Sequence, residues 1–314
     1  MRQSDEFMVV FPLKKEYART TAALDRTGIL TRLPKSDKLG VIGIDGKKYP
    51  IPTQEQLQEV FARNKELVYR KMRQGFTQLQ VTPIAMPTSR LIGLARTAVL
   101  EHAAAGKIIR TKQKQDSSHN ADIPVRVNSS GEPIWIWDRV RKAVDTPKIV
   151  YFPQAYTDCD HHQGLTKEEV IQKKHLCAVP GWSAGLIEPM PIMPQQGHGK
   201  VMGGRKQLEG YSTPHDYLRT LSTPPYQGET GWTQEDFLTY FMTRLEAENQ
   251  VSHDREDSNA LWLLGSYIPD LGGNRMKRLV PVGYWARKRL YLSVHRSANR
   301  FRCCVARSIV RLGA

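Results

Sequence analysis

The chain has 314 residues, of which 40% are hydrophobic and 25% are charged, and its formal net charge is +15. This composition is that of a folded globular protein and excludes a disordered or fibrous chain. Four cysteines at this length do not predict a disulfide framework. No apolar stretch is long enough to cross a bilayer, so we expect no membrane insertion. The leading residues lack the charged-then-apolar order of a signal peptide.

The positive charge is concentrated at the end of the sequence. Residues 271–314 contain no Asp or Glu but eleven Lys and Arg residues. A surface of this kind attracts polyanions or acidic protein surfaces by long-range steering. The plainer alternative is a solvated basic surface without a partner.

The first hundred residues predict alternating short strands and helices. Residues 38–51 predict two strands around an Asp-Gly pair, which supplies the positive φ angles of a hairpin turn. Thr53, with Gln56 three residues later, predicts a capping box at the start of a helix that continues to about Gln74.

A second helix is predicted after a strand at residues 76–81. Thr88 or Ser89 is expected to cap this helix, which should end near Gly106. Residues 115–122 are rich in Ser, Asp and Asn and predict a linker. We therefore divide the chain into an N-terminal α/β region of unknown role, residues 1–118, and a second region, residues 119–314.

The second region has a different pattern. Thr166 with Glu169 predicts the start of one helix, and Thr233 or Gly231 predicts the start of a later one. Residues 179–226 are irregular, and their glycine-rich segment 197–206 is interpreted as a loop that packs over a surface. Strands are predicted at residues 123–127, 134–137, 148–152, 261–268, 283–292 and 306–312. The predicted fold class is therefore α+β.

A cluster of Cys and His residues is the most metal-like feature. Zinc takes such side chains in a tetrahedron, and weak candidates are Cys159, His161, His175 and Cys177. Their spacing matches no standard zinc motif, and a polar loop with a buried Cys177 is the favoured interpretation. We therefore predict no metal and no cofactor.

Catalysis is not predicted. Cys303 and Cys304 lie near His295, and neighbouring arginines would lower the pKa of a thiol. No orienting Asp or Asn lies in the same segment, and no pair of carboxylates is placed for acid–base chemistry. We expect a protein that is not an enzyme.

The last fifty residues carry the most specific signal. A Trp-containing strand around Trp262 is followed by Val280–Trp285, an irregular run at residues 294–305, and a closing Arg-Ser-Ile-Val-Arg strand from Arg307. This layout resembles the C-terminus of C-type-lectin-like variable proteins that retroelements diversify in bacteria and phages. The resemblance implies a C-type-lectin-like fold of the formylglycine-generating-enzyme-like branch for residues 119–314, and a cytoplasmic or virion-associated location.

The resemblance also implies a hypervariable segment. Diversification in that family rewrites adenines, typically in Asn codons, and all twelve residues of 294–305 belong to the set that such codons can reach. The segment has no helical or strand period, which a displayed contact surface does not need.

The expected surface has contact residues and supporting residues. Arg and aromatic side chains are frequent binding anchors. The contact residues would be Tyr284, Ala286, Arg287, Lys288, Arg289, His295, Arg296, Asn299, Arg300, Phe301 and Arg302. The supporting core would be Trp262, Leu264, Trp285, Leu290, Leu292, Ile309 and Val310.

Three functions are compatible with these observations, and the one with the least support is an enzyme with a zinc or thiol site around Cys159–Cys177. The first is a ligand-binding protein that recognises a macromolecular partner, with an acidic protein surface fitting its charge, through a variable C-terminal surface. The alternative is a nucleic-acid-binding protein that uses Lys107–Lys114 and the C-terminal cations, with Tyr284 or Phe301 stacking on bases.

Overall fold

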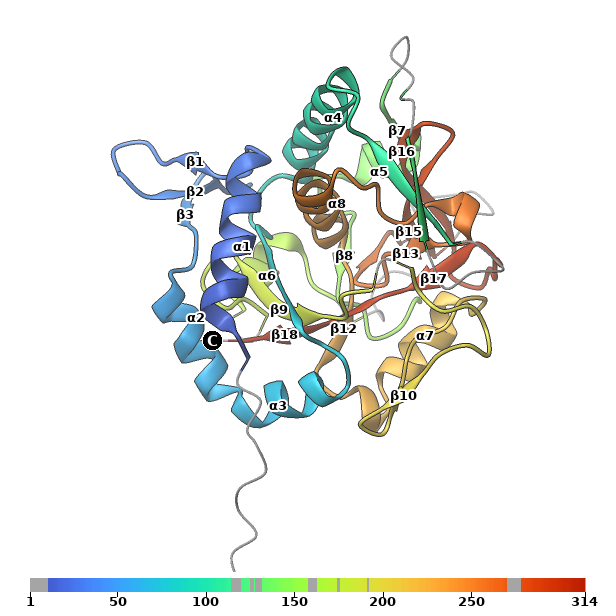
Figure 1. Cartoon of the computed structure of the whole chain (residues 1–314). Coiled ribbons are helices and arrows are strands. Elements are labelled where there is room, and N and C mark those ends of the chain that lie inside the picture. The colour runs from blue at the N-terminus through green and yellow to red at the C-terminus, as the bar shows by residue number, and fades with distance from the viewer. Residues whose placement is uncertain are drawn as a thin grey trace, which may run out of the picture.

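The computed structural model describes residues 11–113, 120–124, 127, 132–157, 163–173, 176–190, 192–269 and 278–313, with the backbone alone for residues 109–113, 120–124 and 257. Helices α1, α2 and α3 lie at one side of the molecule, and a five-stranded sheet lies at the other (Figure 1). Helices α4 and α8 pack against each other between these two sides. The fold is mixed α+β, as the sequence predicted.

The described residues form eight α-helices. They are α1 (Leu13–Arg26), α2 (Gln54–Arg63), α3 (Lys65–Arg73), α4 (Thr88–Ala104), α5 (Asp138–Ala143), α6 (Lys167–Gln172), α7 (Pro214–Leu221) and α8 (Gln234–Glu248). Two 3₁₀ turns, η2 (Pro224–Tyr226) and η3 (Arg255–Asp257), lie on either side of α8. None of the helices in this part of the chain is long and apolar enough to span a bilayer.

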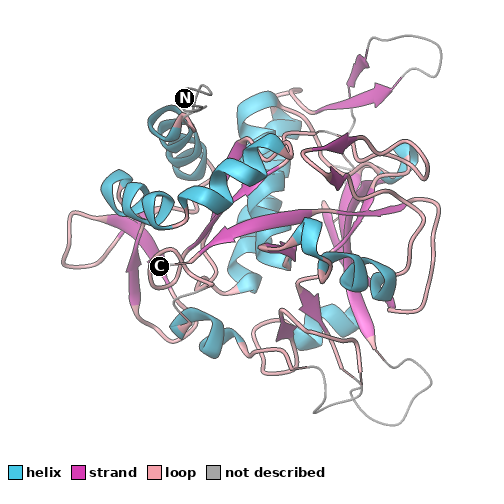
Figure 2. Cartoon of the chain, turned by 90° about the horizontal axis from the view of Figure 1, so that it is seen from below, coloured by secondary structure: helices cyan, strands magenta, loops and turns pink. Residues whose placement is uncertain are grey.

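Besides two larger sheets, the described residues form four small ones. They comprise β1 (Thr31–Arg32), β2 (Leu39–Ile42) and β3 (Lys48–Pro50); β5 (Ile109–Gln113) with β6 (Asn120–Pro124); β8 (Val150–Tyr151) with β14 (Ser266–Tyr267); and β10 (Val201–Met202) with β11 (Arg205–Lys206). Figure 2 shows these elements by type.

The predicted hairpin and capping box of the N-terminal region are confirmed. Strands β2 and β3 pair around Gly46, which has φ +73°, and Thr53 and Gln56 exchange both capping hydrogen bonds. The helix that follows differs from the prediction, because it breaks into α2 and α3 at Asn64. The Asn64 side-chain amide donates to the carbonyls of Val60 (2.8 Å) and Gly313 (3.2 Å), which joins the break to the end of the chain.

A four-stranded sheet combines one strand from the N-terminal region with three strands from the rest of the chain. Its order is β12 (Glu229–Gly231), β18 (Ser308–Leu312), β9 (Ser183–Ile187) and β4 (Gln78–Thr82), and its pairs are antiparallel. Every residue of β9 and β18 is buried. Because β4 comes from the N-terminal region and pairs with β9, residues from both sides of the predicted boundary share one hydrophobic core. The two-region division itself stays a prediction.

The five-stranded sheet is built from the C-terminal half. Its order is β17 (Cys304–Ala306), β13 (Ala260–Trp262), β15 (Leu279–Ala286), β16 (Arg289–Arg296) and β7 (Ile134–Ile136). One face packs against α8, where Trp285 stacks on Phe241 at 6.1 Å between ring centroids. Gly283 faces the Phe237 ring so closely that a Cβ atom there would lie 2.5 Å from a ring carbon.

Several late strands differ from the prediction. The predicted strand at residues 283–292 covers parts of β15 and β16, which are joined by a tight turn at Arg287 and Lys288 with φ values of 45° and 67°. Neither residue is the Gly or Asn that normally indicates such a turn, so the turn could not be predicted from its residues. The predicted strand at 261–268 is divided between β13 and β14, whereas the closing strand is confirmed as β18.

The capping predictions had mixed outcomes. Thr166 caps α6 through the predicted capping box, and Thr233, one of the two residues expected to cap α8, caps it through a box with Asp236 that was not predicted. The prediction for α4 was wrong, because neither Thr88 nor Ser89 caps it with its own side chain. Asp145, 56 or 57 residues away in sequence, accepts the backbone N–H groups of Thr88 (2.7 Å) and Ser89 (2.9 Å) instead.

The glycine-rich segment is held in place by a buried arginine. Strands β10 and β11 form a hairpin around Gly203 and Gly204, which have φ values of +53° and +76°. From β11 the Arg205 side chain, fully buried, donates to both carboxylate oxygens of Glu229 at 2.7 and 2.8 Å. The carboxylate of Glu188 lies 3.4 Å from the same guanidinium.

Candidate functional site

The predicted contact residues all lie in described parts of the five-stranded sheet and its connections. Tyr284 and Ala286 belong to β15, Arg287 and Lys288 to the turn, and Arg289, His295 and Arg296 to β16. Residues 299–302 lie in the connection from β16 to β17. Part of the segment expected to be irregular, residues 294–305, is thus in strands. Its strand period was hidden because the segment covers two strand ends and the loop between them.

Exposure divides these residues into three groups. Tyr284 and Ala286 are each 7% exposed, so they are largely covered. The side chains that reach solvent are Arg287, Lys288, Arg296, Arg300 and Arg302, and those that are half-buried are Arg289, His295, Asn299 and Phe301. The seven expected supporting residues are each at most 2% exposed, which confirms their burial.

Strand register separates the two faces of the sheet. Tyr284 pairs with Tyr291 across β15 and β16, and Tyr291 pairs with Trp135 of β7, so these three side chains share a face. Trp262 pairs with Val282 and lies on the same face. We call this face, which is opposite the one packed against α8, the outer face.

A row of aromatic rings crosses the outer face. Tyr284 and Tyr291 are parallel within 4° at 5.0 Å, and Trp135, 37% exposed, lies 5.4 Å from Tyr291. The exposed guanidinium of Arg255, from η3, lies 5.4 Å from the Tyr284 ring at the opposite end of the row. The row therefore presents an aromatic side chain at one end and a cation at the other.

A second aromatic group surrounds His295. Its imidazole lies 4.7 Å from Phe301, 6.0 Å from Trp262 and 6.5 Å from Trp137. Burial lowers the pKa of His295, and the nearby positive charge of Arg255 lowers it further. His295 is therefore neutral at pH 7 and can offer one donor and one acceptor.

Two arginines of the β16–β17 connection flank an aromatic ring. The guanidiniums of Arg300 and Arg302 lie 5.4 and 5.8 Å from the ring of Tyr211. Asp216 of α7 lies 3.7 Å from Arg300, a surface pair of small energetic value. The connection therefore presents two positively charged groups on an aromatic support.

The C-terminal basic patch is smaller than the sequence suggested. Arg307 and Arg311 are 2% and 6% exposed, so neither belongs to the surface. Arg311 forms an ion pair with Asp236 and donates to Thr230 at 2.9 Å, whereas Arg307 donates to the Glu188 carbonyl at 3.1 Å. Arg275 and Lys277 lie outside the described residues.

The adjacent cysteines are chemically unequal. A hydrogen bond from the Cys304 thiol, together with the charge of Arg255, lowers the pKa of half-buried Cys303 to about 6. The pKa of buried Cys304 is raised, chiefly because its thiol donates to Cys303 and because it is desolvated. Cys303 is therefore the more acidic thiol of the two, but no described carboxylate or imidazole is hydrogen-bonded to it as a base.

The metal candidates are only partly described. Cys159, His161 and His175 lie outside the described residues. Cys177 is 3% exposed, donates to the Val170 carbonyl at 3.4 Å, and has a pKa raised to about 11 by burial. Among the described residues, no group of three or more His, Cys, Asp or Glu side chains is placed to hold a metal ion.

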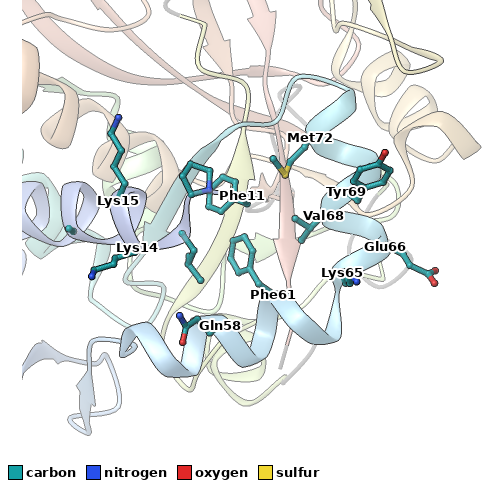
Figure 3. Close-up of a pocket in the computed structure, with 13 residues that line it drawn as sticks. Phe11, Lys14, Lys15, Gln58, Phe61, Lys65, Glu66, Val68, Tyr69 and Met72 are labelled. Atoms are coloured by element: carbon teal, nitrogen blue, oxygen red, sulfur yellow. The ribbon is translucent and has the colours of Figure 1, made fainter. Parts of the chain in front are cut away.

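A large groove lies away from the outer face, on the side of the molecule formed by α1, α2 and α3. Its volume is about 1080 Å³. Figure 3 shows Phe11, Phe61, Val68 and Met72 turned toward it, with lysine side chains around the opening. Sequence analysis missed this groove, because its walls come from two helical segments that are forty residues apart in sequence.

Sequence analysis also missed four residues around the outer face. Trp135 and Tyr291 lie on β7 and β16, and Tyr211 and Arg255 lie in segments without periodicity. Period-two alternation places Tyr291 on the same face as His295, so that residue could have been found. The other three reach the site only through tertiary packing. The chain matches no protein-family model, no curated protein and no solved structure.

Proposed function

We propose that this chain is a binding protein with a C-type-lectin-like C-terminal region that recognises a macromolecular partner through the outer face and residues 287–302. The observation that carries the proposal is the difference between the two faces of the five-stranded sheet. One face is closed against α8 by Trp285 and its neighbours. The other face is buried along β13 and β15 but reaches solvent at Trp135 and, in part, at Tyr291 and His295, and the turn, the end of β16 and the connection after it add exposed arginine and lysine side chains.

The chemistry of this surface supports binding rather than catalysis. Exposed arginines next to aromatic rings combine area with directed hydrogen bonding. The solvent-exposed cations Arg287, Lys288, Arg296, Arg300 and Arg302 favour a partner surface rich in carboxylates. We further propose that residues 294–305 are the target of a diversity-generating retroelement.

The genetic test is direct. The DNA that flanks the gene should contain a near copy of the codons for Tyr284–Ser308, which differs only where the copy carries adenine, beside a reverse transcriptase gene. Finding no such copy would remove retroelement diversification from the proposal.

A second test measures whether the fold tolerates substitutions at this surface. Five exposed or half-buried positions, Arg287, Arg289, Arg296, Asn299 and Arg300, are replaced together by serine. Because their neighbours in the core are unchanged, we expect each replacement to change the free energy of unfolding by no more than about 0.5 kcal/mol, and the five together by less than about 2.5 kcal/mol. The matched variant Trp262→Ser should lose about 3–5 kcal/mol. If the fivefold variant fails to fold, these residues are structural and the display proposal is wrong.

The nucleic-acid alternative rests on Arg300 and Arg302 beside Tyr211. A fluorescent 30-nucleotide single strand is titrated at several salt concentrations. If nucleic acid is the ligand, the binding constant falls steeply with salt, and Tyr211→Ala weakens binding by about tenfold. If binding is absent at low salt, this alternative is rejected.

A further inference from the structure

The walls of the groove beside α1 are mainly apolar. Phe11 and Phe61 stack across it at 5.1 Å between centroids and 26° between planes. Leu13 and Val68 extend this floor, and Tyr69 and Met72, both half-buried, continue it along α3 (Figure 3). Apolar surface gathered in one concave site favours a bound partner.

The rim of the groove is positively charged. Lys14 and Lys15 of α1 and Lys65 of α3 are exposed and line the opening. None of the three has an ion-pair partner among the described residues. Glu66 is the acidic residue among the groove's lining side chains. A ligand that combines an apolar body with carboxylates on its flanks would complement both floor and rim.

The shape and size of the groove favour a helix over a small molecule. At about 1080 Å³ it is at the upper limit of pockets that enclose drug-sized ligands, and it lies open between helical segments rather than inside the core. Helices α2 and α3 together span residues 54–73 along one side of it. An amphipathic helix lays apolar residues at i, i+3, i+4 and i+7 into such a groove.

We propose that the groove between α1 and α2–α3 is a docking site for an acidic amphipathic α-helix of a partner protein. The apolar stripe of that helix contacts Phe11, Phe61 and Met72, and its acidic flanks face the lysines. This site lies on the opposite side of the molecule from the outer face (Figure 1), so the chain could hold one partner while its variable surface binds another. The inference does not depend on the proposed function.

The experiment uses the full chain and a designed peptide of about four helical turns. The fluorescent peptide carries Leu at i, i+3, i+4 and i+7 and Glu on both flanks; a second peptide carries Lys in place of Glu. We expect saturable binding of the Glu peptide, monitored by anisotropy at low salt, and at least about tenfold weaker binding of the Lys peptide.

Two pairs of variants locate the binding. Ala18 is exposed on α1 and lines the groove, so Ala18→Trp should obstruct it and weaken binding at least about tenfold without loss of fold. Ala22→Trp, one turn further along and outside the groove lining, is its control. Lys14→Glu with Lys65→Glu should weaken binding about threefold to tenfold, whereas Lys107→Glu with Lys148→Glu should not.

Other occupants would overturn the proposal. If deletion of residues 1–10 is needed before the peptide binds, the groove is covered by the chain's own leading segment. If the chain self-associates and Ala18→Trp makes it monomeric, the occupant is a second copy. If dodecanoate binds with sensitivity to Ala18→Trp and the Glu peptide does not bind, the groove is a site for amphiphilic anions. If both peptides bind equally, or Ala18→Trp and Ala22→Trp behave alike, the groove is not a specific docking site.

Discussion

Glu229 is the carboxylate on which distant parts of the chain converge. It is fully buried at its side chain and lies 2.6 Å from the Lys71 ammonium of α3. It also accepts from Arg205 at 2.7 and 2.8 Å and from the Ser308 hydroxyl at 2.6 Å. The same carboxylate thus joins α3, the β10–β11 hairpin, β12 and β18.

The perturbation is Glu229→Gln, which keeps the volume and removes the charge. Lys71 and Arg205 would then be two buried cations, with only the carboxylate of Glu188 close to one of them at 3.4 Å. Removing one partner of a buried ion pair costs about 3–5 kcal/mol, because the remaining charge is desolvated and unpaired. This is a large part of the 5–15 kcal/mol that stabilises a typical domain.

Lys71→Met is the matched comparison. Burial is the largest influence on the pKa of Lys71 and lowers it despite the attraction of Glu229, so this ammonium is costly to keep desolvated. Its replacement leaves Glu229 still paired with Arg205. We therefore expect Lys71→Met to cost at least about 2 kcal/mol less than Glu229→Gln.

The free energy of unfolding is measured by urea titration with linear extrapolation, monitored by tryptophan fluorescence and by circular dichroism. The two probes must give one transition for the comparison to apply. If the free energy of unfolding of Glu229→Gln lies within about 1 kcal/mol of that of the unchanged protein, the network is solvated or rearranges easily. The reasoning from buried charge is then refuted.

Three further predictions concern caps, histidine titration and the N-terminal region. Asp145→Ala should destabilise the protein by about 1 kcal/mol, since it removes the acceptor for two N–H groups of α4, while Asp138→Ala on the surface should cost less than half of that. Burial holds the pKa of His253 well below its ordinary value of 6.5. The contribution of this group to the free energy of unfolding is therefore complete above about pH 6.5 and falls as the pH drops, by at most about 1.4 kcal/mol per pH unit. Urea titrations at several pH values should show a shallower decline of the free energy of unfolding for His253→Leu than for the unchanged protein. Residues 119–314 expressed alone should aggregate or lack cooperative unfolding by circular dichroism, because β9 would lose its pairing with β4 along five residues.

Local chemistry in the sequence was sufficient for some elements. The Asp-Gly hairpin and the capping boxes at Thr53 and Thr166 depend on residues within a few positions of one another, and all three form as predicted. Of the two residues expected to cap α8, Thr233 is the cap. The seven expected core side chains of the C-terminal strands are buried, but alternation does not explain this, because every residue of β13, β15 and β18 is buried.

Residues distant in sequence decided the rest. The cap of α4 comes from Asp145, and the break between α2 and α3 is stabilised by a bond from Asn64 to Gly313. The turn at Arg287 and Lys288 adopts positive φ without the usual residues, since the pairing of β15 with β16 imposes it.

The sequence by itself determined the α+β class, the strong positive charge and the seven expected core side chains of the C-terminal strands, but not the burial of Tyr284 and Ala286. Only the tertiary structure decided which cations face solvent, as Arg307 and Arg311 turn inward while Arg300 and Arg302 remain outside. It alone aligned Trp135, Tyr291 and Tyr284 in a row and opened the groove beside α1. The physical reason is that charge and periodicity are local properties, whereas a surface is formed by strands and helices that meet only when the core closes.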